Sequence, residues 1–265
     1  RINELAESLI EIAAKRKMNK GAIHLPDSSI WEKFCSRFQF EETEDQNLAI
    51  REVLSDFSSG FPMDRLICGD VGFGKTEVAL RAALVVALDG FQVAVLAPTT
   101  LLARQHYQTF VERFKDLPIH IERLTRFEKA KEKLSVIDKV KSGVADIVIG
   151  THALLSDAIR FKKLGLLVVD EEQHFGVSHK EVLKKFRPSV HVLTLTATPI
   201  PRTLQLSLTG VRDLSIIATP PVDRLVVRTF VMEFDSLVIR ESLLREKNRG
   251  GQSFFVVPRV SDIPF

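Results

Sequence analysis

Eight consecutive residues at positions 69–76, Gly-Asp-Val-Gly-Phe-Gly-Lys-Thr, fit the phosphate-binding pattern G-x-x-x-x-G-K-[ST]. A strand-like run, residues 63–68, precedes them, and an apolar helical run begins at Lys75. In this order a strand delivers a loop whose N–H groups wrap a polyphosphate, and the helix adds its positive dipole end. We expect Lys75 to reach the β- and γ-phosphates and Thr76 to bind Mg²⁺. The glycines of this predicted ATP or GTP site are Gly69, Gly72 and Gly74.

A second group of chemically capable residues ends the apolar run 166–169, where Asp170, Glu171 and Glu172 follow one another. We expect Asp170 to hold Mg²⁺, directly or through water, opposite Thr76. Glu171 would orient and deprotonate an attacking water. Acidic residues at strand ends are also common solvated turn residues. Beside the glycine loop, however, the pair predicts nucleotide hydrolysis.

Phe38, Phe40 and Gln46 precede the glycine loop. A glutamine amide can donate to and accept from one adenine edge, and a phenyl ring can stack on the base. The residues alone favour a plainer interpretation, in which Gln46 completes a capping box over positions 43–46 and the rings pack in the core. The run Leu-Thr-Ala-Thr-Pro (195–199) could link the carboxylates to whatever the domain grips, through the hydroxyls of Thr196 and Thr198.

Three further loops could hold the backbone of a nucleic acid. In the first and third, a threonine follows a strand at the start of a helix, where its hydroxyl and the free N–H groups can bind a phosphate. Helix capping is the commoner use of such a threonine. The candidate residues are Pro98, Thr99 and Thr100; Arg126; and Gly150, Thr151 and His152.

Composition limits the class of protein. A hydrophobic content of 45% and a charged content of 27% indicate a globular protein, and a net charge of +3 is compatible with nucleic acid. Cys35 and Cys68 lie far apart, which favours reduced thiols in a cytoplasmic protein. No run of about 18 apolar residues or signal-peptide pattern is present, so we expect neither membrane insertion nor secretion. The histidines at positions 106, 152, 174 and 179 show no metal spacing with a carboxylate partner.

Strands and helices alternate around these motifs. The apolar strand runs are typical of a parallel sheet covered on both faces, so we predict a doubly wound α/β fold. Ligands of such sheets bind at the carboxyl ends of the strands, where the motifs fall. The expected strands are residues 63–68, 92–97, 119–124, 147–149, 166–169 and 191–195. The expected helices are residues 44–57, 75 onwards, 99–114, 128–141 and 177–186.

Three segments make up the expected domain organisation. Residues 1–37 form a lead-in that opens with an amphipathic helix over residues 1–18, and residues 38–233 form the nucleotide-binding lobe. Residues 234–265 begin a further lobe, with a helix over 236–247 and a strand over 253–257, preceded by a strand over 225–231. The chain starts with Arg1 and stops at Phe265, and we expect both ends to be cut from something longer.

In this order the motifs resemble the first RecA-like motor lobe of superfamily-two helicases and translocases, from about Phe38 onwards. Within that superfamily the chain looks like the bacterial transcription-repair coupling factors. This closer resemblance rests on residues 69–76 and on the runs Asp-Glu-Glu-Gln-His-Phe-Gly-Val, Thr-Ala-Thr-Pro-Ile-Pro-Arg-Thr and Arg-Asp-Leu-Ser-Ile-Ile-Ala-Thr-Pro-Pro. The related RecG-type branch-migration helicases usually have Ser at the position of Phe73 and lack the Leu-Ser-Ile-Ile-Ala-Thr stretch, residues 214–219.

The resemblance implies an ATP-driven translocase on double-stranded DNA that does not separate the strands. Such a protein displaces stalled RNA polymerase and recruits an excision-repair damage-recognition protein, through parts missing from this chain. The resemblance also implies that Gln46 reads adenine and that the three loops hold the DNA backbone. Thr196, Thr198 and Arg202 would bind DNA or couple it to ATP. One departure is His174, where the family usually has Arg, so that a permanent charge becomes pH-dependent.

Motors of this family hydrolyse ATP between two lobes, and the second lobe supplies an arginine finger. Only the start of a second lobe is present, so we expect this chain to bind ATP and hydrolyse it poorly. Two alternatives remain open: a RecG-type fork-regression helicase, and a nucleotide-gated DNA-binding module without motor activity. The Asp170–Glu171 pair argues against the second alternative, because a binding module does not need a catalytic carboxylate.

Overall fold

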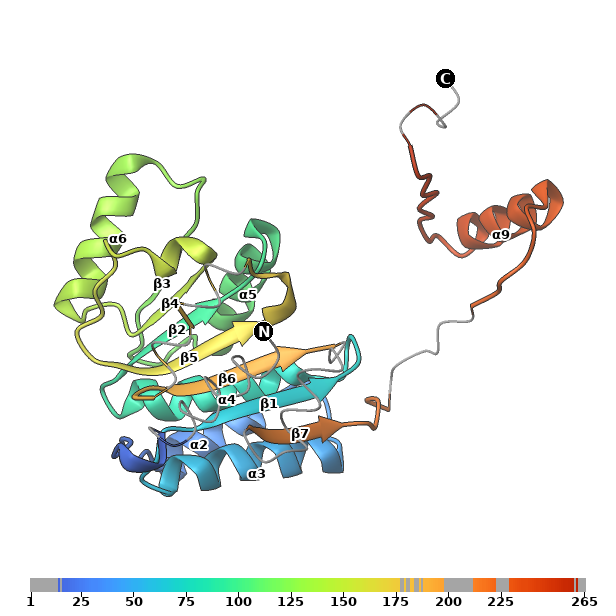
Figure 1. Cartoon of the computed structure of the whole chain (residues 1–265). Helices are drawn as coiled ribbons and strands as arrows, with labels where there is room; N and C mark the ends of the chain where they lie inside the picture. Colours follow the sequence, from blue (N-terminus) through green and yellow to red (C-terminus); the bar gives the residue numbers. More distant parts are fainter. Residues whose placement is uncertain are drawn as a thin grey trace. The chain divides into compact units, whose positions relative to one another are not determined.

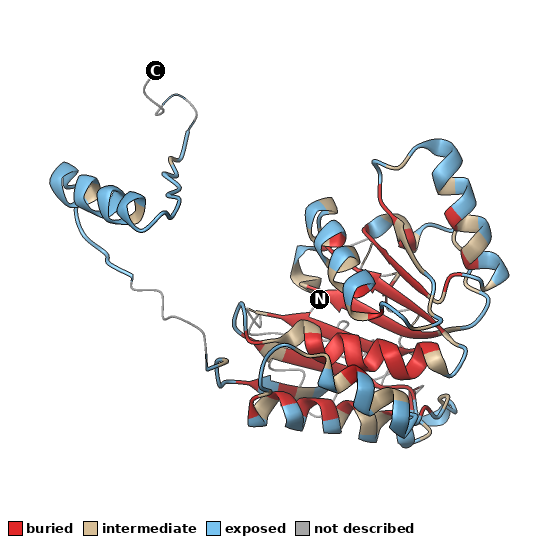
Figure 2. Ribbon diagram, turned by 180° about the vertical axis from the view of Figure 1, so that it is seen from behind, coloured by how far each residue is buried: buried red, intermediate tan, exposed pale blue. Residues whose placement is uncertain are grey.

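The chain divides into two units, residues 1–224 and residues 225–265, in the computed structural model (Figure 1). The structure describes residues 14, 16–176, 179, 182–183, 186, 188–197, 212–222, 229–259 and 261. The first unit contains the sheet and the helices that cover it. In the second unit, the described residues include one helix, α9 (Ser236–Asn248), whose side chains are not buried (Figure 2). The domain limits expected from the sequence stay a prediction.

Seven strands form one parallel sheet in the first unit, in the order β3-β4-β2-β5-β6-β1-β7. The strands are β1 (Asp64–Gly69), β2 (Gln92–Leu96), β3 (Ile121–Leu124), β4 (Ile147–Gly150), β5 (Leu164–Asp170), β6 (His191–Thr196) and β7 (Asp213–Ile217). The central strands are buried along almost their whole length because both faces of the sheet are covered. The sheet confirms the predicted α/β fold.

Alternate residues of each strand enter two separate cores, one on each face of the sheet. In β2, Val93 and Val95 belong to one core, and Ala94 and Leu96 belong to the other. The first core also holds residues of α2, α3, α4 and α5, and the second holds residues of α6. Figure 2 shows the buried sheet with α4 packed against it. The loops that follow the strands gather at the carboxyl edge of the sheet, where a binding site can form.

The helices whose bounds the structure describes in the first unit are α2 (Ser28–Ser36), α3 (Glu44–Ser58), α4 (Lys75–Leu88), α5 (Thr100–Arg113) and α6 (Ala130–Ser142), with short 3₁₀ turns at His152–Leu155 and Glu172–His174. The capping box predicted at the start of α3 is present: the Thr43 hydroxyl accepts from the Gln46 N–H, and the Thr43 N–H donates to the Gln46 side chain. Among the described residues, every helix is too short or too polar to cross a membrane.

Several expected elements differ from the structure. The strand predicted over residues 253–257 is wrong, because residues 251–257 have no regular structure, and the described part of the second unit contains no strand with which they could pair. In the strand expected over residues 225–231, residues 229–231 are likewise irregular. Residues 225–228 lie outside the described residues. Helix α2 and strand β7 were not expected. Most of the predicted helices over 1–18 and 177–186 lies outside the described residues.

Candidate nucleotide site and neighbouring loops

The glycine loop joins β1 to α4. Gly72 and Gly74 have φ values of 81° and 79°, in the left-handed region that glycine adopts without strain. A Cβ at Gly74 would lie only 2.3 Å from the Gln46 side-chain nitrogen, so the loop also has no room there for a larger residue. The Phe73 N–H donates to the Asp70 carbonyl at 3.2 Å and closes the turn. The loop therefore has the strand, the glycines and the following helix that a phosphate cradle needs.

Lys75 folds back over this loop. Its Nζ donates to the carbonyl of Gly69 at 2.6 Å and to that of Asp70 at 3.0 Å. Burial lowers the pKa of Lys75, and the nearby carboxylates of Glu171 and Asp170 act in the opposite direction. The ammonium group thus lies close enough to the acidic pair to interact with it electrostatically. Phosphate oxygens would replace the two carbonyl acceptors.

The acidic pair sits at the end of β5, next to the end of β6. Asp170 is in register with Leu195, and Leu195 is in register with Ile67 of β1, so three neighbouring strands end together. Glu171 has φ 49° and ψ 57°, a left-handed conformation that is uncommon outside glycine and that concentrates at functional sites. This turn directs the Glu171 side chain towards the end of β6.

Glu171 is held by hydrogen bonds from the end of β6 and from the turn that follows β5. The Ala197 N–H donates to Glu171 Oε1 at 3.0 Å, and the Thr196 hydroxyl donates to Oε2 at 3.3 Å. The Gln173 side-chain amide also donates to Oε2. The carboxylate motif and the Thr-Ala-Thr motif are therefore in direct contact, as the two motifs suggested. Thr198 and Arg202, the other residues predicted for this function, lie outside the described residues.

His106 is a member of the site that sequence spacing missed. Its Nε2 lies 2.8 Å from Asp170 Oδ2, although 64 residues separate the two. The sequence shows no metal spacing at His106, and this contact does not make it a metal ligand. The contact joins the middle of α5 to the end of β5, a pairing that spacing along the chain cannot show.

A pocket of about 600 Å³ lies beside the glycine loop. Gly72, Gly74 and Thr76 line one part of it, and Phe38 and Phe40 line another. The two rings meet edge to face, with centroids 5.6 Å apart. The structure thus brings the predicted loop residues and the predicted aromatic residues to one cavity, whose size suits a nucleoside.

Gln46 also borders this pocket but is only 1% exposed. Its side-chain oxygen accepts from the Thr43 N–H, and its side-chain nitrogen donates to the Phe73 carbonyl at 2.9 Å. Both ends of the amide are therefore engaged within the protein. The structure shows a cap and a support for the phosphate loop. The amide keeps a second N–H and a second lone pair, but a contact with adenine would require this buried side chain to become accessible.

A buried ionic network lies behind the aromatic wall of the pocket. Glu77 Oε1 accepts from Arg81 at 2.9 Å and from Arg113 at 2.8 Å, and Arg81 also pairs with Glu42. The guanidinium carbons of Arg81 and Arg113 lie 5.9 and 5.6 Å from the Phe38 ring centroid. This contact favours cation–π attraction and fixes the ring.

The three loops proposed for nucleic acid follow β2, β3 and β4, and these strands are neighbours in the order β3-β4-β2. Because all the strands are parallel, the loops share one half of the carboxyl edge. The glycine loop, which follows β1, lies on the other half of the edge, and β5 with its acidic pair comes between. The site therefore has two halves that meet at Asp170.

Residues of these loops differ in exposure. Thr99 caps α5 by accepting from the Leu102 N–H at 3.2 Å. Arg126 is exposed, and its guanidinium lies 4.9 Å from the ring centroid of the exposed Phe127. Thr151 is only 3% exposed, so its side chain is not on the surface. The exposed His152 stacks on His179, with centroids 4.9 Å apart. Arg126 and His152 are therefore the more accessible candidates in their loops.

The model of the DEAD/DEAH box helicase family matches residues 43–207, which include the glycine loop and the acidic pair. The chain belongs to this family. DEAD/DEAH box helicases bind nucleotide, and the residues described above fit one: the cradle has no room for a larger side chain at Gly74, and the Lys75 ammonium lies over it. Thr76 begins α4 and borders the pocket.

Relatives within the family are more specific. The chain is 55% identical over 267 residues to the transcription-repair-coupling factor of Rickettsia bellii, covering 99% of this chain and 24% of that protein. It is 53% identical to the coupling factor of Bacillus subtilis, covering 99% of this chain and 22% of that one. These identities confirm the resemblance predicted from the motifs. The chain spans about a quarter of the length of these relatives.

Among solved structures, a RecG bound to a three-way DNA junction is similar, with a TM-score of 0.79 and 34% identity over 97% of this chain and 35% of that chain. This likeness agrees with the RecA-like helicase lobe expected from the motif order. The chain thus resembles both the transcription-repair-coupling factors and RecG. Both free cysteines, Cys35 and Cys68, are partly buried.

The described residues also indicate how a Mg²⁺ ion could be held at the nucleotide site. No three His, Cys, Asp or Glu side chains converge on one point in the described part of the chain. Mg²⁺ at such sites is held mainly by phosphates and water, with one or two protein oxygens. The Thr76 hydroxyl and an oxygen of Asp170 would be enough, and oxygen donors are what Mg²⁺ requires.

Proposed function

We propose that this chain is the first motor lobe of a DNA translocase that displaces stalled RNA polymerase and promotes transcription-coupled DNA repair. The observation that carries the proposal is the position of Lys75, which lies over the glycine loop after β1 and interacts electrostatically with Asp170 and Glu171 at the end of β5. Identities of 53–55% with coupling factors support the choice within the family. RNA polymerase and a damage-recognition protein would bind parts of the relatives that this chain does not span.

Each residue of the site has a proposed role. Lys75 binds the terminal phosphates and stabilises the charge that develops on them. Thr76 and Asp170 hold Mg²⁺, which neutralises phosphate charge when it is bound. Glu171 orients the attacking water and accepts its proton. Phe40, whose ring is 57% exposed, offers a face for the base, and Phe38 supports it from behind.

Double-stranded DNA is the proposed track, and the loops after β2, β3 and β4 are its proposed contacts. Their shared position on one half of the edge supports this proposal. Contact between Glu171 and Thr196 supports a role for the Thr-Ala-Thr motif in coupling DNA to ATP. Such a protein would meet its DNA in the bacterial cytoplasm.

The test compares two variants of the nucleotide site. Lys75→Ala should abolish binding of a fluorescent ATP analogue, because the loop loses its ammonium group. Glu171→Gln should keep binding, because the amide preserves the size of the side chain, but it should stop ATP turnover in the full-length protein. Equal losses of binding in both variants would contradict the assigned roles.

This chain alone should bind ATP but hydrolyse it slowly, since an arginine finger from a second lobe is worth about 10³ to 10⁵ in rate in related systems. Steady-state ATPase assays of the 265-residue chain, with and without duplex DNA, measure this directly. Robust turnover stimulated by DNA would disprove the need for the second lobe.

The structural likeness to RecG favours a second candidate, a fork-regression helicase. Full-length protein separates the two: a coupling factor releases polymerase stalled on DNA, whereas a fork-regression enzyme converts a model fork into a four-way junction without releasing polymerase. A protein that binds DNA only with Mg-ATP and never translocates would instead be a nucleotide-gated binding module.

A further inference from the structure

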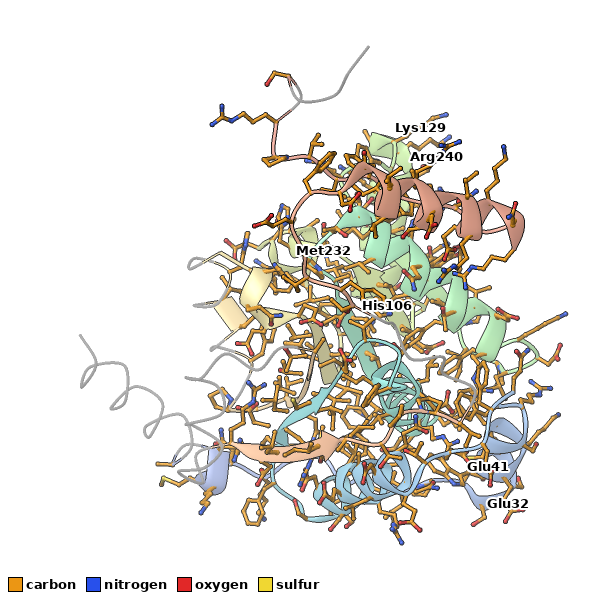
Figure 3. All side chains as sticks on the ribbon, turned by 90° about the vertical axis from the view of Figure 1, so that its right-hand side faces the viewer. Glu32, Glu41, His106, Lys129, Met232 and Arg240 are labelled. Carbon is orange, nitrogen blue, oxygen red and sulfur yellow. The ribbon has the colours of Figure 1, made fainter. Side chains whose placement is uncertain are left out.

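His106 and Asp170 form a contact that the roles above do not use. The imidazole Nε2–H donates to Asp170 Oδ2 at 2.8 Å. The two side chains are 11% and 12% exposed, so little water competes for the bond. Figure 3 labels His106, which extends from the middle of α5.

Packing on both sides fixes the position of His106. Ala103 and Phe110, three residues before it and four residues after it, lie on the same face of the helix and are 0% exposed. Thr99 caps the start of the same helix. The imidazole therefore comes from a well-anchored element, while the Asp170 carboxylate ends a central strand of the sheet.

We propose that His106 is a positioning residue for the cation at the nucleotide site, acting by holding the Asp170 carboxylate in one orientation. The proposal rests on the proposed function, in which Asp170 binds Mg²⁺. The terminal torsion of an aspartate is broad, so an unsupported carboxylate samples many orientations. A hydrogen bond to Oδ2 fixes this torsion and leaves Oδ1 for the cation.

A hydrogen bond that orients a ligating carboxylate has a measurable effect on metal affinity. Outer-shell partners of ligating carboxylates change metal affinity by roughly 10- to 100-fold when they are removed. The effect should concern the cation and not the nucleotide itself, because His106 contacts neither the glycine loop nor the aromatic pocket among the described interactions. Helix α5 also starts at the Pro98–Thr100 loop, so one element joins both halves of the site.

The test measures Mg²⁺ dependence of nucleotide binding in the 265-residue chain. Binding of a fluorescent ATP analogue is followed while Mg²⁺ is titrated, and again in excess EDTA. His106→Leu should require about tenfold more Mg²⁺ for half-maximal binding and should match the unmodified chain in EDTA. His106→Gln can still donate an N–H to Asp170 and should restore most of the Mg²⁺ sensitivity.

A third variant, Gln108→Leu, places the same leucine at an exposed position of the same helix and should titrate like the unmodified chain. Thermal melting without nucleotide confirms that each variant is folded. The inference is overturned if His106→Leu needs no more Mg²⁺ than the unmodified chain, or if His106→Gln is as impaired as His106→Leu. If the unmodified chain binds nucleotide no better with Mg²⁺, the metal role of Asp170 in the proposed function fails first.

Discussion

Gln46 donates a hydrogen bond of 2.9 Å to the main-chain carbonyl of Phe73, so the first turn of α3 supports the phosphate loop. The oxygen of the same amide accepts from the Thr43 N–H. One side chain therefore caps a helix and holds the loop that follows the next strand. This arrangement ties the aromatic side of the pocket to its phosphate side.

Gln46→Glu should separate these two functions. The glutamate keeps an oxygen for the Thr43 N–H, but it presents a carboxylate to the Phe73 carbonyl and loses the donor. We expect ATP and GTP analogues to bind roughly tenfold more weakly, by equal factors, because the loop is disturbed and not the base contact. Thr43→Ala, the control, should lower stability by about 1 kcal/mol and leave binding unchanged. A loss confined to ATP would instead show that Gln46 reads adenine.

Glu77→Gln should destabilise the fold. Arg81 and Arg113 both donate to the Glu77 carboxylate, whose side chain is 4% exposed, and the substitution removes the charge that neutralises them. Breaking a buried ion pair on one side costs about 3–5 kcal/mol. Chemical denaturation measures this cost, and Glu246→Gln is the control because Glu246 pairs with Arg249 on the surface of α9. Equal, small effects would show that the network is solvated.

Stability should fall as pH drops below neutrality, because of His191. Its Nδ1 accepts from the Met63 N–H at 3.0 Å and its Nε2 lies 3.0 Å from the Ala22 carbonyl, so the ring is held neutral. Burial lowers the pKa of His191 from 6.5 to about 4, with His24 contributing in the same direction.

The unfolded chain then binds a proton that the folded chain does not. This loss of stability is absent above pH 6.5. It lowers the free energy of unfolding by about 3 kcal/mol once the pH reaches the folded pKa of about 4. Urea denaturation at several pH values in this window measures the slope. His191→Asn keeps an acceptor near the Met63 N–H and cannot titrate, so its slope should be shallower by roughly 1.4 kcal/mol per pH unit. Parallel slopes would mean that His191 is protonated in the folded state.

Two glycine substitutions should destabilise the chain for different reasons. A Cβ at Gly150 would lie 2.1 Å from the Leu124 carbonyl oxygen, so Gly150→Ala must push β3 and β4 apart. Gly90 has φ 74° and no atom within 4 Å of such a Cβ, so Gly90→Ala adds only backbone strain. By chemical denaturation, we expect Gly90→Ala to lower the free energy of unfolding by about 1 kcal/mol. Gly150→Ala should lower it by about 1–3 kcal/mol or more. The reverse order would show that β3 moves easily.

Local patterns were enough to predict the fold class, the glycine loop and the acidic pair. Each depends on neighbours in sequence: a strand, a turn and a helix at residues 63–88, or an apolar run ending in Asp170 and Glu171. The capping box over positions 43–46 was likewise readable, because its partners are three residues apart. A parallel sheet then brings such motifs to one edge without further information.

Contacts between distant segments were not predictable in this way. His106 meets Asp170 only because the fold brings the middle of α5 next to the end of β5, and no spacing rule covers 64 residues. Strand β7 has a short apolar run whose pairing with β1 depends on the three-dimensional fold. Helix α2 did carry a signal that was missed, the Asp27 cap, which accepts from the N–H groups of Ser29 and Ile30.

The strand that precedes the phosphate loop pairs in the sheet with two strands that are synthesised much later in the chain. Strand β1 is paired with β6 on one side and β7 on the other, and both follow it by about 120 residues or more. During translation β1 therefore has both edges unpaired until most of the first unit has left the ribosome, and unpaired edges favour misassembly. A nascent chain that stops before residue 191 should accordingly bind no nucleotide, even though all eight residues of its phosphate loop have been made.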